Sequence, residues 1–179
     1  MFRISRKADY AVLIMCQLAL REEGLRADGA ADGPLPPISA QETAGNGQLS
    51  KALTANLMKV LTKHGLLESV RGVSGGYRLA RDASDITLAQ ILAAVEGPLA
   101  LVECATHLSF DACLKRPAGA TESENCALTH CCPSRRAMRV VHQRIANLFD
   151  ELTLAELIQI DSRAAELVGL GNSQSNPKP

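Results

Sequence analysis

A cluster of cysteines in the second half of the chain constrains the fold more than any other feature. Five of the six cysteines lie within the 29 residues from Cys104 to Cys132. The stretch between Cys113 and Cys126 is rich in Gly, Pro, Ser and Thr and has the periodicity of neither a helix nor a strand. A loop of this length needs an external reason to be ordered, and a metal centre held by thiolates is one.

The last cysteine of the cluster precedes a long helical pattern. Cys132 is followed by Pro133, and because proline favours the first position of a helix, we predict that Cys132 is the N-cap. The positive end of the helix, together with Arg135 and Arg136, would favour the thiolate form of Cys132. This cysteine is therefore a candidate metal ligand.

Other uses of the cysteines are less consistent with the sequence. No signal peptide opens the chain and no apolar run is long enough to span a bilayer, so we expect a cytoplasmic protein without a membrane partner, in which disulfides are rare. Unligated buried or incidental thiols are a further alternative, but the clustering of five of the six cysteines outside any apolar periodicity argues against it.

The spacing of the cysteines bears on the kind of metal. Structural zinc sites usually pair their ligands as Cys-x-x-Cys, which is absent here. Twenty-one residues separate Cys104 from Cys126, and five separate Cys126 from Cys132. This looser spacing suits an iron-sulfur cluster better, although spacing alone does not identify the metal.

The charge distribution points to a basic segment in the first half of the chain. The formal net charge is zero, so nothing global indicates nucleic acid. Residues 38–81, however, hold six Lys and Arg residues against two Glu residues, a local surplus of four positive charges. This surplus falls on one compact segment.

Helical patterns precede and enter that segment. Ser5 can cap a helix that runs through Tyr10–Leu20, and the Gly/Ala/Asp/Pro-rich residues 23–37 read as an inserted surface loop. Ser39 opens a short helix that ends at Gly45–Gly47, and a second helix follows from about Ser50 to His64. Two helices joined by a short glycine-bearing turn form a helix-turn-helix.

Two short extended runs around a glycine-rich tip follow the second helix and predict the wing of a winged helix. The outer face of the second helix offers short side chains flanked by cations, which suit the major groove of DNA. The candidate DNA-binding residues on this helix and on the wing are Ser50, Lys51, Thr54, Ala55, Lys59, Arg71, Ser74 and Arg78.

The helix after Pro133 carries a narrow apolar stripe at intervals of three and four residues, formed by Met138, Val141, Ile145, Leu148 and Leu152. Such a stripe is typical of a helix that packs along a partner. Packing back on its own domain is the alternative, but a helix-turn-helix protein usually reads a palindromic site as a two-fold dimer. We therefore expect a homodimer on double-stranded DNA.

These predictions define a mainly α fold with a small β-hairpin, a winged helix-turn-helix followed by a long dimerisation helix. We divide the chain into a DNA-binding domain (1–97, with a helix at 87–96), a cysteine-rich loop (98–133), the dimerisation helix with a short helix from Thr153 to about Ile160 (134–161), and a tail expected to be disordered (162–179).

Several motifs together resemble the Rrf family of bacterial winged-helix regulators, of the IscR and NsrR type, from Met1 to about Ile160. They are Arg3–Val12, the wing Val70–Leu79, Asp85–Leu92 and Leu152–Leu157. Residues 96–104 (EGPLALVEC) and 126–133 (CALTHCCP) look most like the regulators of the SUF iron-sulfur assembly system.

The resemblance implies a dimeric repressor or activator that binds a 2Fe-2S or 4Fe-4S cluster through Cys104, Cys126 and Cys132. The fourth ligand varies across the family. It resembles Asp9 from the partner subunit in the nitric-oxide-sensing branch, and His130 and His107 are local alternatives. An aspartate early in a helix also stabilises the positive helix end.

Two other function classes remain as alternatives. A regulator controlled by zinc or by thiol oxidation would use the same cysteines without a cluster. A thiol oxidoreductase is the alternative from the enzymes, but the chain lacks Cys-x-x-Cys in a thioredoxin-like setting, and it shows neither a nucleotide-binding glycine loop nor a hydrolase triad. We therefore predict a regulator and not an enzyme.

Overall fold

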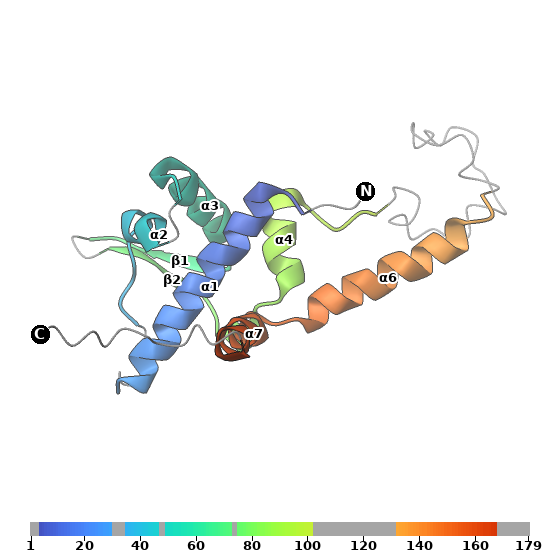
Figure 1. Cartoon of the computed structure of the whole chain (residues 1–179). Coiled ribbons are helices and arrows are strands. Elements are labelled where there is room, and N and C mark those ends of the chain that lie inside the picture. The colour runs from blue at the N-terminus through green and yellow to red at the C-terminus, as the bar shows by residue number, and fades with distance from the viewer. Residues whose placement is uncertain (1–3, 30–34, 47–48, 73–74, 102–131, 168–179) are drawn as a thin grey trace, which may run out of the picture.

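The computed structural model describes residues 4–29, 35–46, 49–72, 75–101 and 132–167, with only the backbone of Arg135 and of residues 161–167. The predicted cysteine loop falls almost entirely on residues 102–131, outside this range. The elements, shown in Figure 1, are α1 (Arg6–Ala27), α2 (Ala40–Asn46), α3 (Lys51–Lys63), β1 (Leu67–Val70), β2 (Gly76–Leu79), the 3-10 turn η1 (Ala83–Asp85), α4 (Leu88–Glu96), α6 (Arg135–Glu151) and α7 (Leu154–Leu167).

Helix α1 begins as predicted but is longer than predicted. Ser5 is its N-cap, and the Ser5 hydroxyl accepts the backbone N–H of Ala8 at 3.3 Å. The helix then continues to Ala27, so the assignment of residues 23–27 to an inserted loop is wrong.

Contacts with distant parts of the chain explain this extension of α1. Arg21 donates to the carbonyl of Pro36 at 2.7 Å, and Arg26 pairs with Asp82 at 3.2 Å. Between them, a Glu22 carboxylate oxygen accepts the backbone N–H of Leu79 at 3.0 Å. Tertiary contacts thus hold the last turns helical despite Gly24.

The helix-turn-helix is confirmed. The Ser39 hydroxyl accepts the backbone N–H of Glu42 at 3.1 Å at the start of α2. Ser50 is the N-cap of α3, and Gly65 follows its C-terminal end with a φ of 70°, a left-handed conformation that glycine adopts without strain.

The wing is an antiparallel hairpin in which Leu67 lies opposite Leu79. Its second strand has another neighbour, because Ile38 forms an isolated bridge with Tyr77 through two backbone hydrogen bonds of 2.9 and 2.8 Å. Strand β2 therefore lies between β1 and the segment that leads into α2. A side chain at position 76 would place its Cβ 2.3 Å from the Ile38 carbonyl oxygen. This close approach explains why glycine occupies the position.

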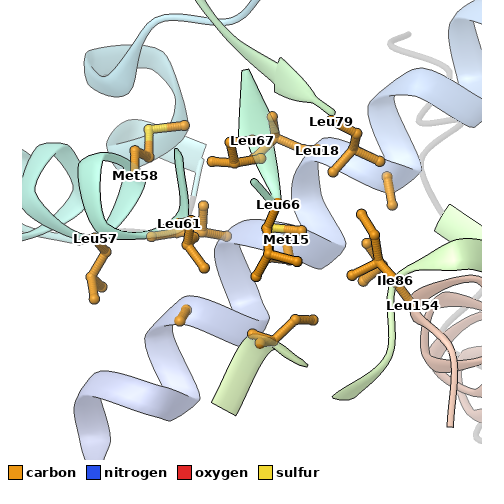
Figure 2. Close-up of a cluster of buried hydrophobic side chains, with 14 of the residues drawn as sticks. Met15, Leu18, Leu57, Met58, Leu61, Leu66, Leu67, Leu79, Ile86 and Leu154 are labelled. Carbon is orange, nitrogen blue, oxygen red and sulfur yellow. The ribbon is translucent and has the colours of Figure 1, made fainter. Parts of the chain in front are cut away.

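One apolar core joins these elements (Figure 2). The cluster contains Met15 and Leu18 of α1 and Leu57 and Leu61 of α3, and the hairpin adds buried leucines to it. Each of the four is at most 2 % exposed. The core fixes α3 and the wing against α1, so the two candidate DNA-binding elements have a common rigid support.

The C-terminal part returns to this core. Leu88 and Leu154 donate backbone hydrogen bonds of 2.8 Å to Leu152 and Ile86, which brings the starts of α4 and α7 together. Thr153 and Glu156 form the predicted capping arrangement. Helix α7 continues to Leu167, so its predicted end near Ile160 and a disordered segment from residue 162 are wrong as far as residue 167.

Candidate nucleic-acid interface and metal-binding segment

Helix α3 presents most of its predicted DNA-binding residues to solvent. Ser50, Lys51 and Lys59 are exposed, and Ala55 is half-buried. Thr54 is fully buried and lies among the core-facing residues of α3, so its placement on the DNA-facing side is wrong. The buried residues of α3 are Thr54, Leu57, Met58 and Leu61, which lie at i, i+3, i+4 and i+7 on one face of the helix.

The two wing arginines differ in their surroundings. Arg71 follows β1 and is exposed. Arg78, on β2, donates from Nε and Nη2 to one carboxylate oxygen of Glu68, at 3.1 and 3.0 Å. Ser74, the other predicted wing residue, lies outside the described residues.

Glu22 is a residue that the sequence did not single out, although it holds the base of the wing. It accepts the N–H of Leu79 on the edge of β2 that β1 leaves open. Burial raises the pKa of the Glu22 carboxyl, while the Leu79 N–H and nearby arginines, Arg78 among them, act in the opposite direction. A polar residue at the end of a long helix gives no sequence signal for such a contact.

Of the predicted metal ligands, the structure describes Cys132 and Asp9. The helix that follows Cys132 begins at Arg135 with Ser134 as N-cap, so the prediction that Cys132 caps the helix is wrong by two residues. The Cys132 thiol is half-buried and lies 3.1 Å from the Ser134 hydroxyl. It therefore still lies beside the positive end of α6.

Asp9 lies exposed in the first turn of α1, at the position where an acidic side chain stabilises the helix end. Cys104, Cys126, His107 and His130 lie outside the described residues. Within the ranges that the structure describes, no three His, Cys, Asp or Glu side chains come close enough to hold a metal ion.

The stripe of α6 is only partly covered. Val141 and Leu148 are 43 and 51 % exposed, whereas Met138, Ile145 and Leu152 are half-buried, and no described side chain of α6 is buried. Figure 1 shows α6 extending away from the helix-turn-helix and the wing. Packing of the stripe on its own domain is therefore at most partial.

A groove of about 680 Å³ lies where α6 meets α4. Leu92 and Glu96 of α4, Leu101 after it, and His142 and Phe149 of α6 are among the residues that line it. Residues 98–101, the described start of the cysteine-rich loop, also line this groove. Among the helices that the structure describes, none is long and apolar enough to cross a membrane.

Comparisons with known proteins agree with this architecture. Residues 4–160 match the family model Rrf2, described as an iron-dependent transcriptional regulator. The regulator IscR of Yersinia pseudotuberculosis is 30% identical over 156 residues, covering 87% of this chain and 79% of its own. IscR of Photobacterium profundum is 30% identical over 167 residues, covering 93% and 81%.

Solved structures give the same result. The chain is 26% identical to IscR of T. potens, with a TM-score of 0.60 over 91% of this chain and 90% of the other. It is also 26% identical to CymR, the global cysteine regulator of B. subtilis, with a TM-score of 0.61 over 89% and 98%. These relatives are transcriptional regulators and not enzymes. The chain therefore belongs to the Rrf2 family of winged-helix, DNA-binding transcriptional regulators.

Proposed function

We propose that this protein is a homodimeric regulator in which an iron-sulfur cluster controls binding to a two-fold-related DNA site. The observation that carries the proposal is the position of Cys132 at the start of α6. Its thiol lies beside the N-terminal end of the helix whose apolar stripe is partly exposed. A ligand held at this point acts on the same helix that would join two subunits.

The residues present fit a cluster in their chemistry. Cys104, Cys126 and Cys132 would supply three thiolates, which are the usual ligands of 2Fe-2S and 4Fe-4S clusters. The fourth ligand would be Asp9 of a second copy, or His130 or His107 of the same chain. When bound, the cluster supplies a centre that responds to redox state, oxygen or nitric oxide.

Dimerisation would use the stripe Met138, Val141, Ile145, Leu148 and Leu152. Half-buried and exposed apolar residues at intervals of three and four suit packing against the same helix of a second copy. A two-fold arrangement presents two α3 helices to successive major grooves. The spacing of the two DNA-binding domains is then set by α6.

DNA contact would use the exposed residues of α3 and the wing. Ser50, Lys51, Ala55 and Lys59 would face the major groove, and Arg71 and Ser74 would contact the adjoining backbone or minor groove. Lys51, Lys59 and Arg71 are all exposed. Cluster ligation changes DNA affinity only as far as the cluster binds one arrangement of the dimer better than another.

The proposed target genes are those of SUF iron-sulfur assembly, with repression as the mode of control. The support is the likeness of residues 96–104 and 126–133 to that branch, and the description of the family as iron-dependent. A regulator that carries a cluster would report on the supply of clusters. The proposed location is the cytoplasm.

Five alanine variants test the cluster directly. Anaerobically purified wild-type protein is expected to show broad visible charge-transfer bands with stoichiometric iron and sulfide. Removing a ligand removes most of the metal affinity, so Cys104→Ala, Cys126→Ala and Cys132→Ala should each lose these bands.

Cys113→Ala and Cys131→Ala are the matched controls and should keep near-normal iron content and spectrum. Loss in Cys131→Ala with retention in Cys132→Ala would show that the wrong member of the adjacent pair has been assigned. A colourless wild-type protein that carries zinc would contradict the cluster and favour a regulator controlled by zinc or by thiol oxidation.

A further inference from the structure

An ion pair crosses the wing between its two strands. Glu68 on β1 lies directly opposite Arg78 on β2 in the ladder. Both Arg78 Nε and Arg78 Nη2 donate to the same Glu68 oxygen, at 3.1 and 3.0 Å. The Arg78 side chain is 23 % exposed and that of Glu68 is 53 % exposed, so the carboxylate is the more accessible partner.

The pair lies on the face of the hairpin that turns away from the core. The neighbouring positions Leu67 and Leu79 are buried, and side chains alternate between the two faces of a strand. Glu68 and Arg78 therefore share the outer face.

This outer face belongs to a hairpin with a fixed position beside the helix-turn-helix. The residue next to Arg78, Tyr77, exchanges backbone hydrogen bonds with Ile38, which immediately precedes the cap of α2. Figure 1 shows the hairpin running beside α2. For Arg78 to matter in DNA binding, the DNA backbone that α3 binds must lie against this outer face of the hairpin.

The charge of Arg78 is already engaged within the protein. It is paired with Glu68, and it also acts electrostatically on Glu22 of α1. A phosphate would have to displace the Glu68 carboxylate from the guanidinium and would meet that negative charge as it approached. Arg71 differs, because it is exposed at the end of β1.

We propose that Glu68 limits the affinity of this protein for DNA by keeping Arg78 from the phosphate backbone. The inference rests on DNA binding through α3 and the wing. Because phosphate contacts carry no sequence information, Glu68 would lower the affinity for an operator and for unrelated DNA by the same factor. Arg78 would then stay paired with Glu68 and not contact DNA, and Arg71 would be the wing arginine that contacts DNA.

Glu68→Gln is the informative change because it keeps the shape of the side chain and removes its charge. A surface ion pair contributes little to stability, so the variant is expected to fold. Glu23→Gln is the matched control, since Glu23 is also exposed but lies on α1, outside the hairpin. Arg78→Ala and the double variant Glu68→Gln/Arg78→Ala show whether any gain in DNA affinity depends on Arg78.

The experiment measures binding of the full-length protein to an oligonucleotide selected by the wild type and to an unrelated duplex, over a range of salt concentrations. One new phosphate contact makes the slope of log K against log salt steeper by about 0.9, which corresponds to an affinity gain of up to about eightfold at 0.1 M salt. Glu68→Gln should show this gain equally on both duplexes. Glu23→Gln should show neither change, and the double variant should match Arg78→Ala.

Two results would overturn the proposal. One is a folded Glu68→Gln variant with lower affinity or an unchanged salt slope, which would make the pair a purely structural brace of the wing. The other is a double variant that keeps the gain, since the gain would then not depend on Arg78. Failure to select any oligonucleotide would refute the proposed regulator instead, and the unrelated duplex would still decide the role of Glu68.

Discussion

Replacing Thr54 by Val is expected to stabilise the protein. Thr54 is fully buried in α3, and its hydroxyl is one of the buried polar atoms without a hydrogen-bond partner in the described part of the chain. Its backbone N–H is satisfied by Ser50 at 2.9 Å, so only the side chain carries a desolvation cost. A buried polar group without a partner costs about 1–3 kcal/mol.

Valine has nearly the same shape as threonine and a similar helix propensity. We therefore expect Thr54→Val to raise the free energy of unfolding by about 1 kcal/mol, the lower end of that range. For a chain of this size, the midpoint of thermal unfolding should rise by about 2–4 °C. Thermal and urea denaturation at one fixed protein concentration measure both quantities.

Thr43→Val is the matched control. Thr43 is equally buried, but its hydroxyl donates to the Ser39 carbonyl at 3.0 Å, so the same substitution should lower stability. The DNA affinity of Thr54→Val should equal that of the wild type, because the side chain faces the core. If Thr54→Val were destabilised as much as Thr43→Val, or if it lost DNA affinity, the conclusion that the Thr54 side chain faces the core without a hydrogen-bond partner would be refuted.

Three further predictions follow from the wing. Arg71→Ala should weaken DNA binding and reduce the salt slope by about 0.9 if the contact is to phosphate, which titrations at several salt concentrations would test against Lys63→Ala. Gly76→Ala should destabilise the hairpin because its Cβ would lie 2.3 Å from the Ile38 carbonyl oxygen, and an unchanged unfolding midpoint would contradict this. Glu22→Gln keeps a side-chain oxygen that can accept the Leu79 N–H. It removes the carboxyl group, and burial raises the pKa of that group above 4.5. The stability contributed by that carboxyl is present below pH 4.5 and is lost as the pH rises through its folded pKa. The free energy of unfolding of the variant, relative to that of the wild type, should therefore increase between acid and neutral pH.

Local signals predicted much of the fold. The helix start at Ser5 and the capping pair Thr153 and Glu156 are confirmed because capping depends on residues only three apart in the chain. The hairpin is confirmed for the same reason, since its turn residues and alternating strands are contiguous.

Features that depend on distant contacts could not be predicted. The length of α1 depends on partners from Pro36 to Asp82, and the place of the wing depends on the Ile38 bridge. The burial of Thr54 is different, because Thr54, Leu57, Met58 and Leu61 lie at i, i+3, i+4 and i+7 on one face of α3, a spacing that the sequence does contain. At the start of α6, Pro133 predicted Cys132 as the N-cap, whereas Ser134 is the N-cap in the structure.

The measurement that tests the central claim most directly is the affinity of the anaerobic protein for a selected two-fold DNA site, with and without its cluster. Control of DNA binding by the cluster predicts that the two affinities differ by about 5–150-fold, the usual range for coupling between two sites. It also predicts that Cys132→Ala shows one affinity under both conditions. Equal affinities for the cluster-bound and cluster-free wild type, or no enrichment of any sequence by either form, would contradict the account.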